Sequence, residues 1–85
     1  MSAETLADMK AVVNRYPYAP AMSELAYALA LNGRVDEASK LFTKIQLVHG
    51  PAIYAVQLKA LRVRTEGGST AMRAWEASLP TELPQ

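Results

Sequence analysis

The sequence predicts an all-α fold of five helices, and three features lead to that prediction. Alanine and leucine, which favour helices, are abundant. Apolar residues recur at intervals of three and four, which places them on one face of a helix. The four glycines, five prolines and single phenylalanine are too few for a β structure with many turns. Because the chain has 85 residues, 51% of them hydrophobic, one small core and a single domain are expected.

The first two helices are predicted on either side of a proline-bounded connector. Pro17 and Pro20 bound it, because proline disfavours helical backbone in the residue before it. The first helix is expected over about residues 4–15. The second is expected over about residues 20–31, with a proline at its start, where a missing N–H costs nothing. Their apolar faces are expected to hold Leu6, Met9, Val13 and Tyr16 in the first helix and Met22, Leu25, Ala26 and Leu29 in the second.

Glycines mark both ends of the third helix. Asn32-Gly33 is predicted to close the second helix as a left-handed cap. Asp36 and Glu37 then open the third helix, where acidic side chains suit the helix dipole. Gly50-Pro51 ends it. The apolar face of this helix is expected to hold Ala38, Leu41, Phe42 and Ile45.

Two further helices complete the prediction. The fourth is expected over about residues 51–65 and ends at Gly67-Gly68, and Ser69 is a predicted N-cap of the last helix. Pro80 and Pro84 prevent that helix from continuing. We therefore expect a single domain over residues 1–79 and a flexible tail over residues 80–85. The apolar faces are expected to hold Tyr54, Leu58 and Leu61 in the fourth helix and Ala71, Trp75 and Leu79 in the fifth.

Residue types that carry out chemistry are sparse. The chain has no cysteine, two aspartates and one histidine, His49, which sits at a predicted helix end. A metal site would need further ligands at helical spacing. Gly67-Gly68-Ser69-Thr70 lacks the lysine of a phosphate-binding loop. The sequence therefore predicts no catalytic residue, no metal and no cofactor.

Basic residues gather in the middle of the chain, although the net charge is only +1. Six of them, against two acidic residues, fall between residues 34 and 64. A net charge this small does not favour nucleic acid as a partner. A small helix-turn-helix protein that binds DNA through residues 59–64 stays open as an alternative. The six are Arg34, Lys40, Lys44, Lys59, Arg62 and Arg64.

The 34 residues 19–52 resemble one tetratricopeptide repeat, a helical hairpin about 34 residues long. Residues 53–84 resemble a second, poorer unit, and the first helix resembles the second half of a preceding one. This resemblance implies a right-handed superhelix fragment built from antiparallel helix hairpins. The matching residues are Met22, Leu25-Ala26, Leu29, Gly33, Ala38, Phe42 and Gly50-Pro51 in the first unit and Leu58, Gly67, Ala71 and Trp75 in the second.

In repeats of this family the first helix of each pair lines a concave groove. The resemblance thus implies a protein or peptide partner in a groove whose partner-binding residues are Ser23, Tyr27, Gln57, Leu61 and Arg64. The lysine and asparagine with which some members grip a terminal carboxylate are replaced here by Ser23 and Tyr27.

A narrower resemblance involves Tyr16-Pro17, the run from Leu25 to Arg34, and Asp36-Glu37-Ala38. These residues are similar to the soluble C-terminal region of bacterial O-antigen polymerase and ligase-like membrane enzymes, which include the O-oligosaccharyltransferases. The resemblance implies a periplasmic accessory region beside the membrane part of a parent enzyme. The alternative is a free-standing, cytoplasmic adaptor that binds a peptide. The longest apolar stretch, Leu25 to Leu31, is far shorter than the roughly 18 residues of a membrane span, and residues 2–4 do not predict a signal peptide.

Repeat units bury their faces only against neighbours, and about three are needed for independent stability. Two and a half are predicted here. We therefore expect an exposed apolar end face that a parent chain or a second copy covers. The candidate residues are Val12, Val13 and Tyr16 in the first helix or Met72, Trp75 and Leu79 in the last.

Overall fold

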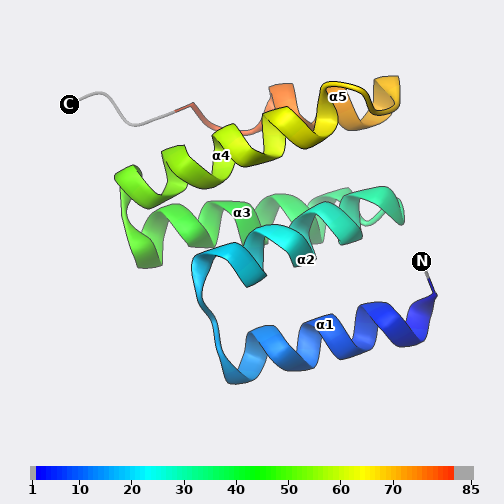
Figure 1. Ribbon diagram of the computed structural model, residues 1–85, viewed down its shortest axis with the longest axis vertical. Helices are drawn as coiled ribbons and strands as arrows, with labels where there is room; N and C mark the ends of the chain where they lie inside the picture. Colours follow the sequence, from blue (N-terminus) through cyan, green and yellow to red (C-terminus); the bar gives the residue numbers. More distant parts are fainter. Residues whose placement is uncertain (1, 82–85) are drawn as a thin grey trace.

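Five α-helices make up most of residues 2–81, which are the residues that the computed structural model describes (Figure 1). Consecutive helices pack against one another in antiparallel fashion. The all-α prediction is confirmed, and each expected helix lies close to its expected bounds. The helices are α1 (Ala3–Arg15), α2 (Ala19–Leu31), α3 (Val35–His49), α4 (Pro51–Thr65) and α5 (Thr70–Ser78).

Serine side chains cap two of the helices. The Oγ atom of Ser69 accepts a hydrogen bond from the backbone N–H of Met72 at 3.2 Å, which confirms the predicted N-cap of α5. Ser2 does the same for α1, where its Oγ accepts from the N–H of Thr5 at 3.1 Å. Each cap satisfies a backbone donor that the helix itself cannot pair.

The turn between α2 and α3 is a Schellman motif centred on Gly33. The N–H of Gly33 donates to the carbonyl of Ala30 at 3.0 Å, and the N–H of Arg34 donates to the carbonyl of Leu29 at 2.9 Å. The φ angle of Gly33 is 78°, a left-handed conformation that glycine adopts without steric cost. The predicted left-handed cap is therefore confirmed.

Gly50 alone joins α3 to α4. Its φ of 90° and ψ of 165° fall in a region of backbone conformation that is essentially restricted to glycine. Pro51 follows as the first residue of α4, where its lack of an N–H is harmless. One glycine thus reverses the chain between two 15-residue helices.

Helix α2 lies at the centre of the molecule and contacts each of the other four helices. Small side chains make this possible, because they let the neighbouring backbones approach closely. Its interface with α3 is the most extensive between any two helices. The buried residues of α2 are Ala19, Met22, Ser23, Leu25, Ala26, Ala28, Leu29 and Ala30.

Three aromatic rings form the core between α3, α4 and α5. The rings of Phe42 and Tyr54 meet edge to face with centroids 5.3 Å apart, and those of Phe42 and Trp75 do so at 6.4 Å. This geometry suits the charge distribution of aromatic rings. The indole N–H of Trp75 donates to the Oγ of Ser39 at 3.1 Å, so its polar group is satisfied. The expected core positions of all three aromatic residues are confirmed.

Two expected apolar faces differ in detail from those observed. In α5 the core position belongs to Met72, which is 4% exposed, whereas Ala71 faces outward. Residues 72, 75 and 79 keep helical spacing, so the buried face of this segment differs from the expected one only at its first position. Tyr16, expected on the apolar face of the first helix, is exposed, because it follows the last residue of α1 in a non-helical conformation. Leu41 of α3 is only partly buried.

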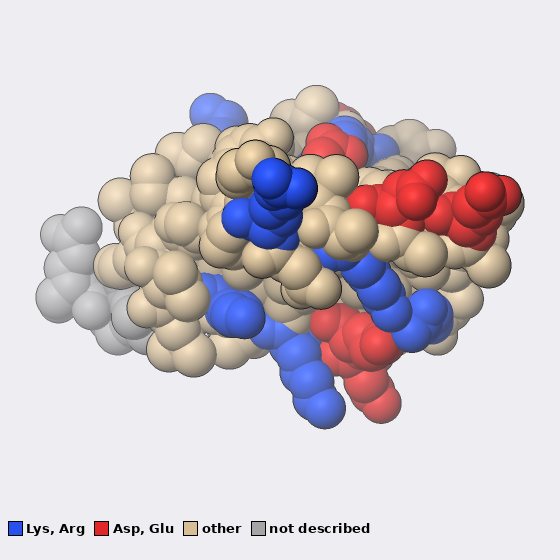
Figure 2. Space-filling view, turned by 90° about the horizontal axis from the view of Figure 1, so that it is seen from below, with Lys and Arg blue, Asp and Glu red and all other residues tan. Residues whose placement is uncertain are grey.

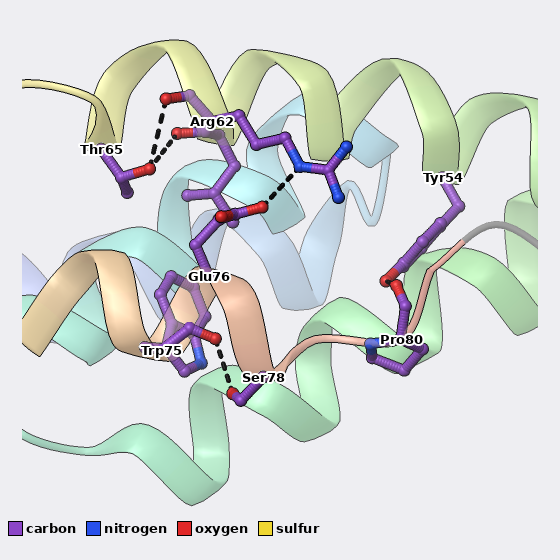
Figure 3. Close-up of polar contacts among 8 residues, drawn as sticks. Tyr54, Arg62, Thr65, Trp75, Glu76, Ser78 and Pro80 are labelled. Atoms are coloured by element: carbon purple, nitrogen blue, oxygen red, sulfur yellow. Dashed lines mark hydrogen bonds and ion pairs between the residues drawn. The ribbon is translucent and has the colours of Figure 1, made fainter.

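The chain after α5 returns along α4 (Figure 3). The Tyr54 hydroxyl donates a hydrogen bond to the carbonyl oxygen of Pro80. The Nε atom of Arg62 lies 2.6 Å from the Glu76 carboxylate, which joins α4 to α5 near the surface. The tail expected over residues 80–85 falls mostly on residues 82–85, outside the described part of the chain, and stays a prediction.

Candidate functional site

An apolar groove of about 330 Å³ lies between α1 and α2. It forms where the small side chain of Ala21 on α2 faces larger residues of α1. Val12 remains 50% exposed at its edge. Two carboxylates, Asp8 and Glu24, stand among its otherwise mainly apolar residues. We call this feature the α1–α2 groove, lined by Thr5, Asp8, Met9, Val12, Val13, Tyr18, Ala21 and Glu24.

A polar cluster adjoins the groove at Glu24. Arg64, near the end of α4, forms an ion pair with the Glu24 carboxylate and donates a hydrogen bond to the Oγ of Ser23 at 3.3 Å. Its guanidinium carbon also lies 5.1 Å from the centroid of the Tyr27 ring. A cation over an aromatic face in a partly exposed place contributes about 0.5–1 kcal/mol. We call these four residues, Ser23, Glu24, Tyr27 and Arg64, the Arg64 cluster.

The Arg64 cluster joins α2 to α4, because its members come from positions about 40 residues apart. The Nε atom of Arg64 is buried and has no hydrogen-bond partner within residues 2–81. The planar guanidinium is therefore held by its two terminal nitrogens and by the tyrosine face. A small movement of the Glu24 side chain, which is largely exposed, would free one of these nitrogens for another acceptor.

The structure brings together three of the five predicted partner-binding residues, Ser23, Tyr27 and Arg64. Ser23 and Leu61 are fully buried, so their side chains pack inside the protein. Tyr27, Gln57 and Arg64 are partly accessible. That the five residues bind a partner stays a prediction. Among them only Tyr27, Gln57 and Arg64 have side chains that a partner could reach.

Apolar exposure is found at the first helix rather than the last. Val12 and Tyr16 are 50% and 58% exposed, whereas Val13 is buried. At the other end Met72, Trp75 and Leu79 are all buried. The face of α1 is thus the one of the two expected end faces that is open to solvent. Seen from the α1 side, one group of acidic side chains lies towards one end, whereas basic side chains lie mainly over the middle, some of them beside further acidic ones (Figure 2).

Sequence reasoning missed the carboxylates of this site. The sequence explains Asp8 only as a residue that favours the start of a helix. Glu24 gives no motif, although it is the one charged residue of α2. That isolation in an alanine-rich helix was the available signal. Arg64, which forms the ion pair with Glu24, is too distant in sequence for helical spacing to reveal the contact.

His49 connects the end of α3 to the connector before α2. Its Nε2 atom lies 3.0 Å from the carbonyl oxygen of Pro17. A carbonyl can only accept, so the imidazole carries its proton on Nε2 in this contact. Residues 2–81 contain no group of three or more histidine, cysteine, aspartate or glutamate side chains placed to hold a metal ion.

The basic stretch 59–64 is partly neutralised by acidic side chains. Arg62 pairs with Glu76 and Arg64 pairs with Glu24. Lys59 forms no ion pair with any residue in the described range 2–81. The stretch therefore presents one unpaired charge rather than three.

Comparison of the chain with known protein families, with curated proteins and with solved structures found no significant match. Within residues 2–81, none of the helices has the length and apolar character that crossing a membrane would require.

Proposed function

We propose that this chain is a non-catalytic interaction domain that binds a segment of another polypeptide in the α1–α2 groove. The observation that carries the proposal is the groove itself, which offers an apolar surface beside two carboxylates. Binding sites in proteins are typically concave and mostly apolar, with a few polar groups that orient the ligand. The Arg64 cluster extends the surface towards α4 through Glu24.

We further propose that α2–α3 and α4–α5 are two tetratricopeptide-like units of a right-handed superhelix fragment, with α1 as the second half of a preceding unit. The contact of α2 with α4 supports this arrangement, because the first helices of neighbouring units lie side by side in such repeats. The Arg64 cluster crosses the same contact. In this arrangement Tyr27, Gln57 and Arg64 line the concave face beyond the α1–α2 groove.

The lining predicts the chemistry of the bound segment. Apolar side chains would occupy the space beside Met9, Val12 and Ala21, and a lysine or arginine would approach Asp8. An exposed carboxylate or backbone carbonyl of the same segment would suit Arg64. A short amphipathic segment with basic residues meets these requirements.

Selection of random peptides displayed on phage against the immobilised chain tests this function. Recovered sequences should combine apolar residues with lysine or arginine, and their binding should fall at least tenfold on Val12→Arg, which fills the groove with a cation. Ala11→Arg is the matched control, since Ala11 is exposed on the same helix but does not line the groove. Peptides that bind both variants equally would show that the groove is not the binding site.

The narrower proposal is that the chain is the periplasmic accessory region of a membrane glycan polymerase or O-oligosaccharyltransferase. Its support is the sequence run from Leu25 to Arg34, which forms α2 and its cap. The free-standing adaptor is the alternative. The coding sequence around this segment distinguishes them: a series of membrane spans in the same reading frame favours the accessory region, and their lack favours the adaptor.

DNA binding receives less support than peptide binding. A helix that recognises a duplex needs several free cations, and Arg62 and Arg64 are each paired with a carboxylate. We expect no binding to duplex DNA at low ionic strength. Binding that weakens steeply with added salt would instead favour the helix-turn-helix alternative.

A further inference from the structure

Helix α4 carries a second exposed apolar surface, on the side away from the core. Its members follow one another at intervals of three, four and three residues, so they share one face of the helix. The opposite face holds the buried residues Tyr54, Leu58 and Leu61. Val56 and Val63 are 60% and 66% exposed. We call this surface the α4 ridge: Ile53, Val56, Ala60 and Val63.

The charges beside the ridge are opposite to those of the α1–α2 groove. Lys59 stands between Val56 and Val63 and pairs with no acidic residue in the part of the chain that the structure describes. Asp8, in the groove, likewise has no basic partner there. A free lysine on an apolar ridge and a free aspartate in an apolar groove are complementary in both charge and polarity.

The two surfaces lie on different helices, with α1 and α4 on opposite sides of α2 (Figure 1). One molecule can therefore offer its groove to one neighbour and its ridge to another. The ridge also matches the segment that the lining of the groove predicts, because it is amphipathic, helical and basic. Association of a groove with a ridge is heterologous and can continue from copy to copy.

We propose that the α1–α2 groove binds the α4 ridge of a second copy of this chain, with Val56 and Val63 in the groove and Lys59 beside Asp8. The contact is head-to-tail, so that each copy uses both surfaces. This inference rests on the proposed function, since it names the occupant of the same groove.

Sedimentation velocity of two charge variants tests the contact. Val12→Arg alters only the groove. Val56→Glu alters only the ridge, and in the proposed contact it brings an acidic side chain close to Asp8 of the neighbouring copy. We expect the wild type to sediment faster as its concentration rises, and each variant alone to remain a monomer. Ala11→Arg and Ala77→Glu, at exposed positions outside both surfaces, should associate like the wild type.

A mixture of the two variants gives the decisive result. The Val12→Arg copy retains an intact ridge and the Val56→Glu copy retains an intact groove, so the mixture should form a one-to-one complex that grows no further. A wild type that stays monomeric, a groove variant that still associates alone, or a mixture that stays monomeric would each overturn the proposal. If the wild type stays monomeric but still selects groove-binding peptides, the self-association fails and the proposed function survives.

Discussion

The hydroxyl of Tyr54 on α4 donates a hydrogen bond to the carbonyl of Pro80, 26 residues further along the chain. The ring of Tyr54 is buried against Phe42, so the contact connects the aromatic core to the segment that leaves α5. It also fixes where that segment runs.

Tyr54→Phe should lower the free energy of unfolding by about 1 kcal/mol, because it removes one hydrogen bond and leaves the packing of the ring unchanged. Urea denaturation followed by circular dichroism measures this difference. Tyr16→Phe, at an exposed position, is the control and should have no effect. Equal stability of Tyr54→Phe and the wild type would mean that the bond adds nothing.

Stability should fall in alkaline solution partly through Tyr54. Burial raises the pKa of Tyr54 above its usual 10.0, with the Arg62 guanidinium acting against this shift and the Glu76 carboxylate adding to it. Below pH 10 the phenol is neutral in both states and its contribution is complete. As the pH rises past 10 the unfolded chain ionises first, so stability is lost until the pH exceeds the folded-state pKa.

The difference in Tm between about pH 8 and about pH 11 measures this effect. The wild type should lose more than Tyr54→Phe, because phenylalanine cannot ionise and all other titrating groups are common to both chains. An identical loss in the two proteins would contradict the raised pKa.

Phe42→Ala should cost about 3–5 kcal/mol, since it leaves a cavity between Tyr54 and Trp75. A loss of this size is comparable to the whole stability of a small domain. Phe42→Leu is the companion variant, with a smaller loss expected because it keeps most of the volume. Thermal unfolding monitored by Trp75 fluorescence compares them, and an alanine variant as stable as the leucine variant would argue against this core.

Gly50→Ala should destabilise the chain by about 1–3 kcal/mol, because a Cβ atom is strained at this φ and ψ even though no neighbouring atom lies within 4 Å. Gly67→Ala is the matched control. Gly67 also has open space where a Cβ atom would lie but has no positive φ, so its variant should stay within about 0.5 kcal/mol of the wild type. Similar urea midpoints for both variants would exclude backbone strain as the cause.

Met72→Ala and Ala71→Gln together test which of these two neighbouring residues of α5 packs into the core. Met72 is buried, so its truncation should cost about 2–5 kcal/mol. Ala71 is exposed, so a glutamine there should change stability by less than about 0.5 kcal/mol. The reverse order of stabilities would support the orientation expected from the sequence.

The sequence was sufficient to place the helices, because their ends carry strong local signals. Gly33, Gly50-Pro51 and Ser69 act through backbone conformation and capping, which depend on few neighbours. The central stripe Met22, Leu25 and Leu29 was also placed correctly, since α2 is surrounded by other helices. Such a helix buries most of its apolar positions whatever its rotation.

The first core position of α5 and the contacts between distant residues could not be predicted. In α5 both Ala71 and Met72 lie near the apolar face, and only packing against the rest of the core decides between them. The pairing of Arg64 with Glu24 depends on how α4 crosses α2, which no spacing within either helix encodes. The α1–α2 groove likewise depends on how α1 and α2 pack against each other, which the sequence pattern of neither helix encodes.

The central position of α2 also determines how the molecule opens. Local unfolding of any other helix exposes one side of α2 to solvent. The backbone amides of α2 nevertheless stay protected from exchange until its remaining neighbours unfold as well. Amide hydrogen exchange should therefore be slowest in α2, at a rate that reports on global unfolding, and fastest at the outer turns of α1 and α5.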